Sequence, residues 1–158
     1  MRAVICSQWG PPESLQLGEL PEPRPAAGEV MLCVDASAVN FADLLMISGR
    51  YQFRPQLPFA PGFEAAGEVL ACGTGVEHLW PGDRAMAICR YHGGFAERVA
   101  VQAATCVRIP DDLDFVREAA LPIAYSTAII ALQRRGELAS GERLKGAGCC
   151  RWGRPSNR

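Results

Sequence analysis

Glycine and proline interrupt the first 110 residues of the chain at short intervals. The sequence of 158 residues holds 16 glycines and 12 prolines, and runs such as Trp9-Gly10-Pro11-Pro12 and Trp80-Pro81-Gly82-Asp83 are strong turn signals. Short apolar segments lie between the turns, at 2–7, 15–17, 30–38, 64–72, 84–88, 95–101 and 106–109. Many short strands separated by glycine and proline predict a mostly β fold with a few helices, either a barrel or a sandwich.

Helical signals occur in two regions. Asn40 is a good N-cap for a helix whose apolar face is formed by Phe41, Leu44, Leu45 and Ile47. After residue 110 the pattern changes, because Asp114 is placed to cap a short helix over 115–120. Residues 124–135 then suit a buried helix that ends at Gly136.

Composition excludes several classes of protein. Hydrophobic residues make up 49% of the chain and charged residues 21%, so the chain can bury a core. The formal net charge of −1 provides no basic excess for nucleic-acid binding. No apolar run approaches the roughly 20 residues that span a bilayer, and the apolar stretch at the amino terminus is too short for a signal peptide. We therefore expect a cytoplasmic protein with no nucleic-acid or membrane partner.

The seven cysteines do not form a recognisable metal or disulfide pattern. They stand at positions 6, 33, 72, 89, 106, 149 and 150, with no C-x-x-C pair. Most of those in the first 140 residues lie in apolar runs, where cysteine usually behaves as a small buried hydrophobe. Cys89 and His92 form a C-x-x-H pair, but no further ligands stand at suitable spacing. We expect no metal site.

A series of short motifs follows along residues 1–144. In order they are Met1-Arg2-Ala3-Val4, Gly10-Pro11-Pro12-Glu13, Asn40-Phe41-Ala42-Asp43, Ser48-Gly49-Arg50-Tyr51, the run from Leu57 to Gly67, Gly73-Thr74-Gly75-Val76, Pro81-Gly82-Asp83-Arg84, Gly93-Gly94-Phe95-Ala96-Glu97 and Ser126-Thr127-Ala128. In this order they resemble the amino-terminal portion of zinc-independent quinone oxidoreductases (NADPH:quinone reductases) of the medium-chain dehydrogenase/reductase superfamily. The fold that the resemblance implies is an alcohol-dehydrogenase-like, GroES-like barrel followed by a Rossmann domain.

The resemblance also implies a domain organisation. Residues 1–113 would form an incomplete GroES-like domain of the catalytic type, and residues 114–144 the interdomain helices that begin a truncated nucleotide-binding domain. The helix over 124–135 would pack against a Rossmann sheet that this sequence lacks, which would leave its apolar face uncovered. We therefore expect the chain to self-associate.

The expected chemistry follows from the same resemblance. Zinc-dependent relatives carry Gly-His-Glu where this chain has Gly62-Phe63-Glu64, and phenylalanine cannot bind a metal. In the metal-free branch a hydride passes from NADPH to a quinone or a conjugated carbonyl. Asp43 and Glu64 are expected to be structural rather than catalytic.

Three residues correspond to the family's site. Asn40 and Tyr51 would be catalytic and donate hydrogen bonds to the carbonyl that gains charge, while Asn40 and Thr127 would lie against the nicotinamide of the cofactor. Each also has an ordinary structural explanation: Asn40 as a helix cap, Tyr51 as a loop anchor and Thr127 as a helix residue bonded to its own backbone.

The phosphate-binding loop of the family is not recognisable. No G-x-G-x-x-G motif follows a predicted strand, and residues 145–158 show no periodicity. Read one nucleotide later, the codons of Gly146 to Arg154 permit Val-Leu-Gly-Ala-Ala-Gly-Gly-Val-Gly, the family's strand and loop. We interpret 145–158 as an out-of-frame tail and exclude it from the fold.

Two hypotheses for function remain. The first is the family's metal-free, NADPH-dependent reductase, with NADPH as the cofactor of full-length members and a quinone or enone as the small-molecule substrate. The second is that the polypeptide as written is a non-catalytic GroES-like remnant that does not bind NADPH, because a hydride donor needs a phosphate-binding domain.

Overall fold

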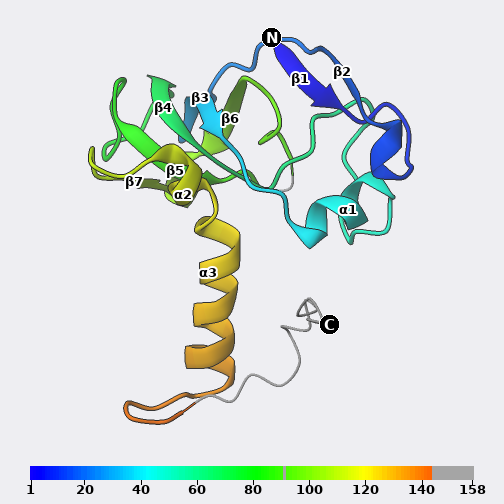
Figure 1. Ribbon diagram of the computed structural model, residues 1–158. Helices are drawn as coiled ribbons and strands as arrows, with labels where there is room; N and C mark the ends of the chain where they lie inside the picture. Colours follow the sequence, from blue (N-terminus) through cyan, green and yellow to red (C-terminus); the bar gives the residue numbers. More distant parts are fainter. Residues whose placement is uncertain (91, 144–158) are drawn as a thin grey trace, which may run out of the picture. The chain divides into compact units, whose positions relative to one another are not determined.

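The computed structural model describes residues 1–90 and 92–143, and its centre is an antiparallel sheet of five strands (Figure 1). The strand order across the sheet is β6-β3-β4-β5-β7. The mostly β architecture predicted from the turn signals is confirmed, and β4 and β5 have the predicted bounds. The strands span Glu29–Ala36 (β3), Glu64–Cys72 (β4), Arg84–Ile88 (β5), Arg98–Gln102 (β6) and Cys106–Arg108 (β7).

A separate hairpin is attached to this sheet through the loops. It pairs β1 (Arg2–Ile5) with β2 (Gln16–Glu19), with a 3₁₀ turn over Pro12–Ser14 between them. The other edge of β1 bonds to loop segments: the Val4 N–H donates to the Phe95 carbonyl at 2.9 Å, and the Cys6 N–H donates to the Phe59 carbonyl at 2.8 Å. The hairpin therefore covers the loops that precede β4 and β6.

Two apolar clusters make up most of the core. The larger is formed by inward side chains of β3 to β7 and the segments between them: Val30, Leu32, Ala65, Val69, Leu79, Ala85, Ala87, Cys89, Val99, Val101, Ala103 and Cys106. The second joins Cys6, Met46, Ile47, Phe59 and Phe63, and the half-buried Tyr51 and Ile123 pack against it. This second cluster brings together Cys6, which follows β1, the first helix and the start of the helix that contains Ile123.

Helix α1 spans Phe41–Ile47 and begins after Asn40, as predicted. Its predicted apolar face is wrong at two positions, because Phe41 is 74% exposed and Leu44 is 43% exposed. The buried face instead carries Asp43, Met46 and Ile47, which follow helical i, i+3, i+4 spacing. A carboxylate occupies the inward face because it accepts backbone hydrogen bonds there, which hydropathy alone does not reveal.

The two later helices follow the predicted order. Helix α2 spans Phe115–Ala119 and lies against β3, β4 and β5; the Asp114 carboxylate caps it by accepting the Arg117 N–H at 2.8 Å. Helix α3 spans Pro122–Ile129, and a π-helical segment continues it over Ile130–Arg135 to Gly136.

The burial predicted for this last helix from its apolar pattern is wrong, whereas the uncovered apolar face expected from the resemblance is what the structure shows. Tyr125 is 61% exposed, Ile129 52% and Ile130 50%. Burial of a helix that is apolar on several sides needs a second layer packed against it, and the two sheets within residues 1–90 and 92–143 leave these three side chains exposed.

The described cysteines behave as expected from their apolar surroundings. Cys6, Cys89 and Cys106 are buried, and Cys33 and Cys72 are half-buried; all five are free thiols. Burial raises the pKa of Cys89, and it raises the pKa of Cys106 to about 12, so both stay protonated at neutral pH.

Some predictions fall outside what the structure describes. The tail predicted over 145–158 lies beyond the described residues, and the division predicted between 113 and 114 stays a prediction. The chain has one compact unit over Met1–Thr127, and a second unit begins at Ala128. None of the helices in the described ranges is both long and apolar enough to cross a membrane.

Candidate functional site

A buried carboxylate at the start of β4 is the centre of the candidate site. Glu64 is only 1% exposed, although it lies among apolar neighbours. Its Oε1 accepts a hydrogen bond from the Asn40 side-chain Nδ2 at 2.7 Å, and its Oε2 accepts one from the Ile123 backbone N–H at 2.7 Å. The Ser37 hydroxyl donates to the Glu64 backbone carbonyl. These donors offset the cost of burying the charge.

Asn40 connects this carboxylate to the start of α1. Its backbone N–H donates to Asp43 Oδ2 at 2.7 Å, which closes the first turn of the helix. Its side-chain Nδ2 also lies 3.5 Å from the Ala38 carbonyl, the outer limit for a hydrogen bond. One amide hydrogen of Asn40 is therefore firmly bound to Glu64, and the other is only weakly engaged.

Asp43 is a second buried carboxylate beside the first. It is 3% exposed, and its Oδ1 accepts the Gly62 N–H at 3.1 Å. Burial is the main cause that raises the pKa of Asp43 above its ordinary value; backbone hydrogen bonds oppose the shift, and the nearby Glu64 charge adds to it. Asp43 therefore links the turn before β4 to α1 through hydrogen bonds.

The raised pKa of Asp43 gives a pH-dependent prediction. The stability that its bound proton contributes is present below the unfolded pKa of about 4 and is lost as the pH rises through the folded pKa. Asp43→Asn has no proton to release, so we expect it to reduce the free energy of unfolding more at about pH 4 than at about pH 7. Urea unfolding at both pH values measures the difference, with the exposed Asp35→Asn as control. A loss of unfolding free energy that is equal at the two pH values, or larger at about pH 7, would contradict the expectation.

The other two residues predicted for the site lie near this network without joining it. The Tyr51 ring packs edge-on against Phe63, with 5.2 Å between the ring centroids, in the cluster that also contains Ile123. Thr127 is exposed and lies one turn after Ile123 on α3. Among the described residues, no hydrogen bond joins Tyr51 or Thr127 to Asn40.

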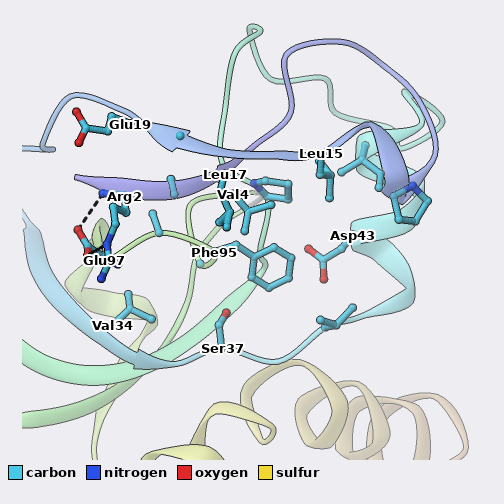
Figure 2. Close-up of a pocket in the computed structure, with 18 of the residues that line it drawn as sticks. Arg2, Val4, Leu15, Leu17, Glu19, Val34, Ser37, Asp43, Phe95 and Glu97 are labelled. Atoms are coloured by element: carbon cyan, nitrogen blue, oxygen red, sulfur yellow. Dashed lines mark hydrogen bonds and ion pairs between the residues drawn. The ribbon is translucent and has the colours of Figure 1, made fainter.

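A cavity of about 960 Å³ is lined in part by Asp43 (Figure 2). Its walls include Val4 and Leu17 from the hairpin and Phe95 from the loop before β6, and the carboxylate of Asp43 is at one end. Asn40, Tyr51 and Thr127 do not line it. This cavity and the predicted site are therefore adjacent but distinct.

The Cys89–His92 pair shows no features of a metal centre. Cys89 is 1% exposed, and the His92 ring packs against Phe59, with 5.9 Å between the ring centroids. Within residues 1–90 and 92–143, no three histidine, cysteine, aspartate or glutamate side chains are grouped so that they could hold a metal ion.

Sequence reasoning missed the connection between Glu64 and α3. Glu64 was expected to be structural, but its hydrogen bond from the Ile123 N–H was not predicted. A signal was present, because a glutamate inside the apolar run Phe63-Glu64-Ala65-Ala66 must find buried donors. The identity of those donors depends on the tertiary fold.

Comparisons with known proteins agree with the expected resemblance. Residues 26–111 match the family model of the alcohol dehydrogenase GroES-like domain. The chain is 39% identical over 142 residues to mouse quinone oxidoreductase-like protein 2, an alignment that covers 89% of this chain and 39% of that protein. The chain spans only about two fifths of the length of such curated relatives.

Solved structures confirm the GroES-like fold. The human synaptic vesicle membrane protein VAT-1 homolog-like protein superposes with a TM-score of 0.84 at 36% identity, over 89% of this chain and 45% of that one. The quinone oxidoreductase from Thermus thermophilus, also solved in complex with NADPH, gives a TM-score of 0.72 at 39% identity, over 86% of this chain and 41% of the other.

Proposed function

Because the chain belongs to the alcohol dehydrogenase GroES-like domain family, we propose that it forms the substrate-side domain of a metal-free, NADPH-dependent oxidoreductase acting on a quinone or a conjugated carbonyl. The observation that carries the proposal is the hydrogen bonding of the Asn40 side-chain amide. One of its hydrogens is donated to Glu64, and the other is only weakly engaged. The similarity to quinone oxidoreductases, one of them solved with NADPH, supports the same activity.

The side chains around Glu64 do not fit a catalytic zinc ion. Phe63, beside Glu64, has no atom that can bind a metal, and both carboxylate oxygens of Glu64 already accept hydrogen bonds. A catalytic zinc site needs about three protein ligands, and the described residues provide no such group. Carbonyl activation in this proposal therefore depends on hydrogen-bond donors.

NADPH, when bound, would supply the hydride. Asn40 would donate its weakly engaged amide hydrogen to the acceptor carbonyl as negative charge develops there, and the Tyr51 hydroxyl would be a second donor. Thr127, exposed on α3, would lie toward the nicotinamide. Neutral donors of this kind orient a carbonyl and stabilise its developing charge, but they transfer no electrons themselves.

A second candidate concerns the 158-residue polypeptide as a separate molecule. Its sequence has no G-x-G-x-x-G motif, and the backbone amides of such a loop hold the phosphates of a dinucleotide. This favours a non-catalytic GroES-like domain that does not bind NADPH by itself. A cytoplasmic location likewise stays a prediction.

A hybrid protein tests the first proposal against the second. Residues 1–143 would replace the matching segment of a full-length quinone oxidoreductase, which supplies a cofactor domain. We expect the hybrid to oxidise NADPH when a quinone is added, whereas the 158-residue chain alone shows neither turnover nor saturable NADPH binding. A folded hybrid that binds NADPH but reduces no quinone or enone would contradict the first proposal. Micromolar NADPH binding by the chain alone would contradict the second.

We also infer that the isolated chain self-associates. Exposed apolar side chains occur on the hairpin at Leu17, which is 86% exposed, and near α1 at Val39 and Phe41, which are 75% and 74% exposed. Such exposure promotes association in water. Size-exclusion chromatography with light scattering, run in reductant, is expected to give a mass above 17.0 kDa. A 17.0 kDa monomer with a cooperative thermal transition would contradict this inference.

The contribution of the exposed side chains at the start of α1 can be tested with a substitution. Phe41→Ser is expected to shift the distribution toward monomer, because it removes an exposed aromatic ring. Val116→Ser is the matched control, since Val116 is also 74% exposed but lies on α2. Equal effects of the two substitutions would show that association does not involve the surface near α1.

A further inference from the structure

Glu64 accepts hydrogen bonds from two elements that are distant in the sequence. Asn40 is 24 residues before it and Ile123 is 59 residues after it, yet each donates to a different carboxylate oxygen at 2.7 Å. Both contacts come from N–H groups, one of a side chain and one of the backbone. Replacement of either donor would leave a buried carboxylate oxygen without its partner.

The contact with Ile123 occurs at the first turn of α3. The helix begins at Pro122, which has no N–H, so the N–H of Ile123 is the first helix donor without an intrahelical acceptor. A carboxylate at this end of a helix also interacts favourably with the helix dipole. Glu64 therefore fixes the point at which α3 begins, and Thr127 lies one turn farther along the same helix.

The contact with Asn40 fixes the direction of an amide. A carboxylate only accepts hydrogen bonds, so the amide nitrogen of Asn40, and not its oxygen, must face Glu64. In this orientation the second N–H of the Asn40 amide is left for the Ala38 carbonyl oxygen, which lies 3.5 Å from Nδ2. If the amide were rotated by half a turn, its oxygen would meet the carboxylate, and that contact is repulsive.

We propose that Glu64 is a positioning residue that sets the amide orientation of Asn40 and the start of α3 with one carboxylate, so that two residues of the candidate site are placed by the same side chain. The proposal rests on the proposed function for the roles of Asn40 and Thr127. Glu64 itself does not touch the substrate in this account. Its effect on the reaction passes through the residues that it holds.

Glu64→Gln is the most informative substitution. Glutamine has nearly the same shape, but it offers one acceptor oxygen and one amide group, so it can accept from Asn40 or from Ile123 but not from both. Glu68→Gln is the matched control, because Glu68 lies on the same strand, is exposed and loses the same charge. A general effect of charge on the domain would appear in both variants, and loss of the double contact only in the first.

Nuclear magnetic resonance on the 158-residue chain provides the test. In Glu64→Gln we expect hydrogen exchange at the Ile123 amide to become about 10-fold faster or more, or the Asn40 side-chain amide signals to shift as its bond is lost. In the unsubstituted chain, scalar couplings across the hydrogen bonds should connect the Glu64 carboxyl carbon with both Ile123 N and Asn40 Nδ2. These couplings decide the matter if Glu64→Gln does not fold.

The outcomes separate this proposal from the proposed function. The positioning role would be overturned if the couplings were absent. It would also be overturned if the exchange rate of Ile123 and the signals of Asn40 changed no more in Glu64→Gln than in Glu68→Gln. Either result would leave the hydride-transfer proposal untouched. Both couplings, together with the changes expected in Glu64→Gln, would establish the positioning contacts even if the hybrid protein were inactive, and the failure would then lie with the proposed function.

Discussion

Gly67→Ala is expected to destabilise the sheet strongly. Gly67 pairs with Val34 where β3 and β4 lie side by side, and a Cβ at this position would be 1.8 Å from the Cys33 carbonyl oxygen and 2.8 Å from its carbon. Both atoms belong to the backbone, so the steric overlap can be removed only if the two central strands move apart. We expect a loss of more than about 3 kcal/mol in the free energy of unfolding, the upper end for overpacked sites. Urea unfolding followed by circular dichroism measures it.

Gly75→Ala is the control for this prediction. Gly75 has a φ of +84°, but no atom lies within 4 Å of an added Cβ. Its substitution therefore costs only the conformational strain of a positive φ, about 1–2 kcal/mol. A Gly67→Ala protein that is no less stable than Gly75→Ala would show that β3 and β4 do not approach as closely as the structure indicates.

The strands were the most predictable part of the fold. The bounds 64–72 and 84–88 agree with β4 and β5, because Gly73 follows the first segment and Pro81-Gly82-Asp83 precedes the second. The close approach at Gly67 was not predictable, since it depends on which strand pairs with β4. The burial of α1 was mispredicted because Asp43, a charged residue, occupies a position that hydropathy assigns to solvent.

The candidate site was predictable only in part. The resemblance supplied Asn40, Tyr51 and Thr127, and the structure connects the first of these with the start of α3 through Glu64. That connection uses a backbone N–H of Ile123, and every residue except proline carries such a group. Sequence patterns identify side chains with chemical roles, but they do not identify which backbone donor completes a site.

Asn40→Ser is expected to reduce the turnover of the hybrid enzyme about 100-fold, the effect of removing one donor to a developing oxyanion. Serine is a good N-cap, so this substitution keeps the start of α1 while it removes both amide hydrogens. The affinity for NADPH is expected to change little, because the phosphates are bound by the other domain. Tyr51→Phe, which keeps the ring contact with Phe63, is expected to have a smaller effect of the same kind.

The most direct measurement is the rate of quinone-dependent NADPH oxidation by the hybrid and by its Asn40→Ser variant, both at saturating NADPH and quinone. Thermal unfolding of both proteins shows first that the variant keeps the fold. If the Asn40 amide activates the acceptor carbonyl, kcat falls by about 100-fold while the KM for NADPH stays within a few-fold. Equal kcat values in two equally stable proteins would contradict the account, because Asn40 would then be only a helix cap.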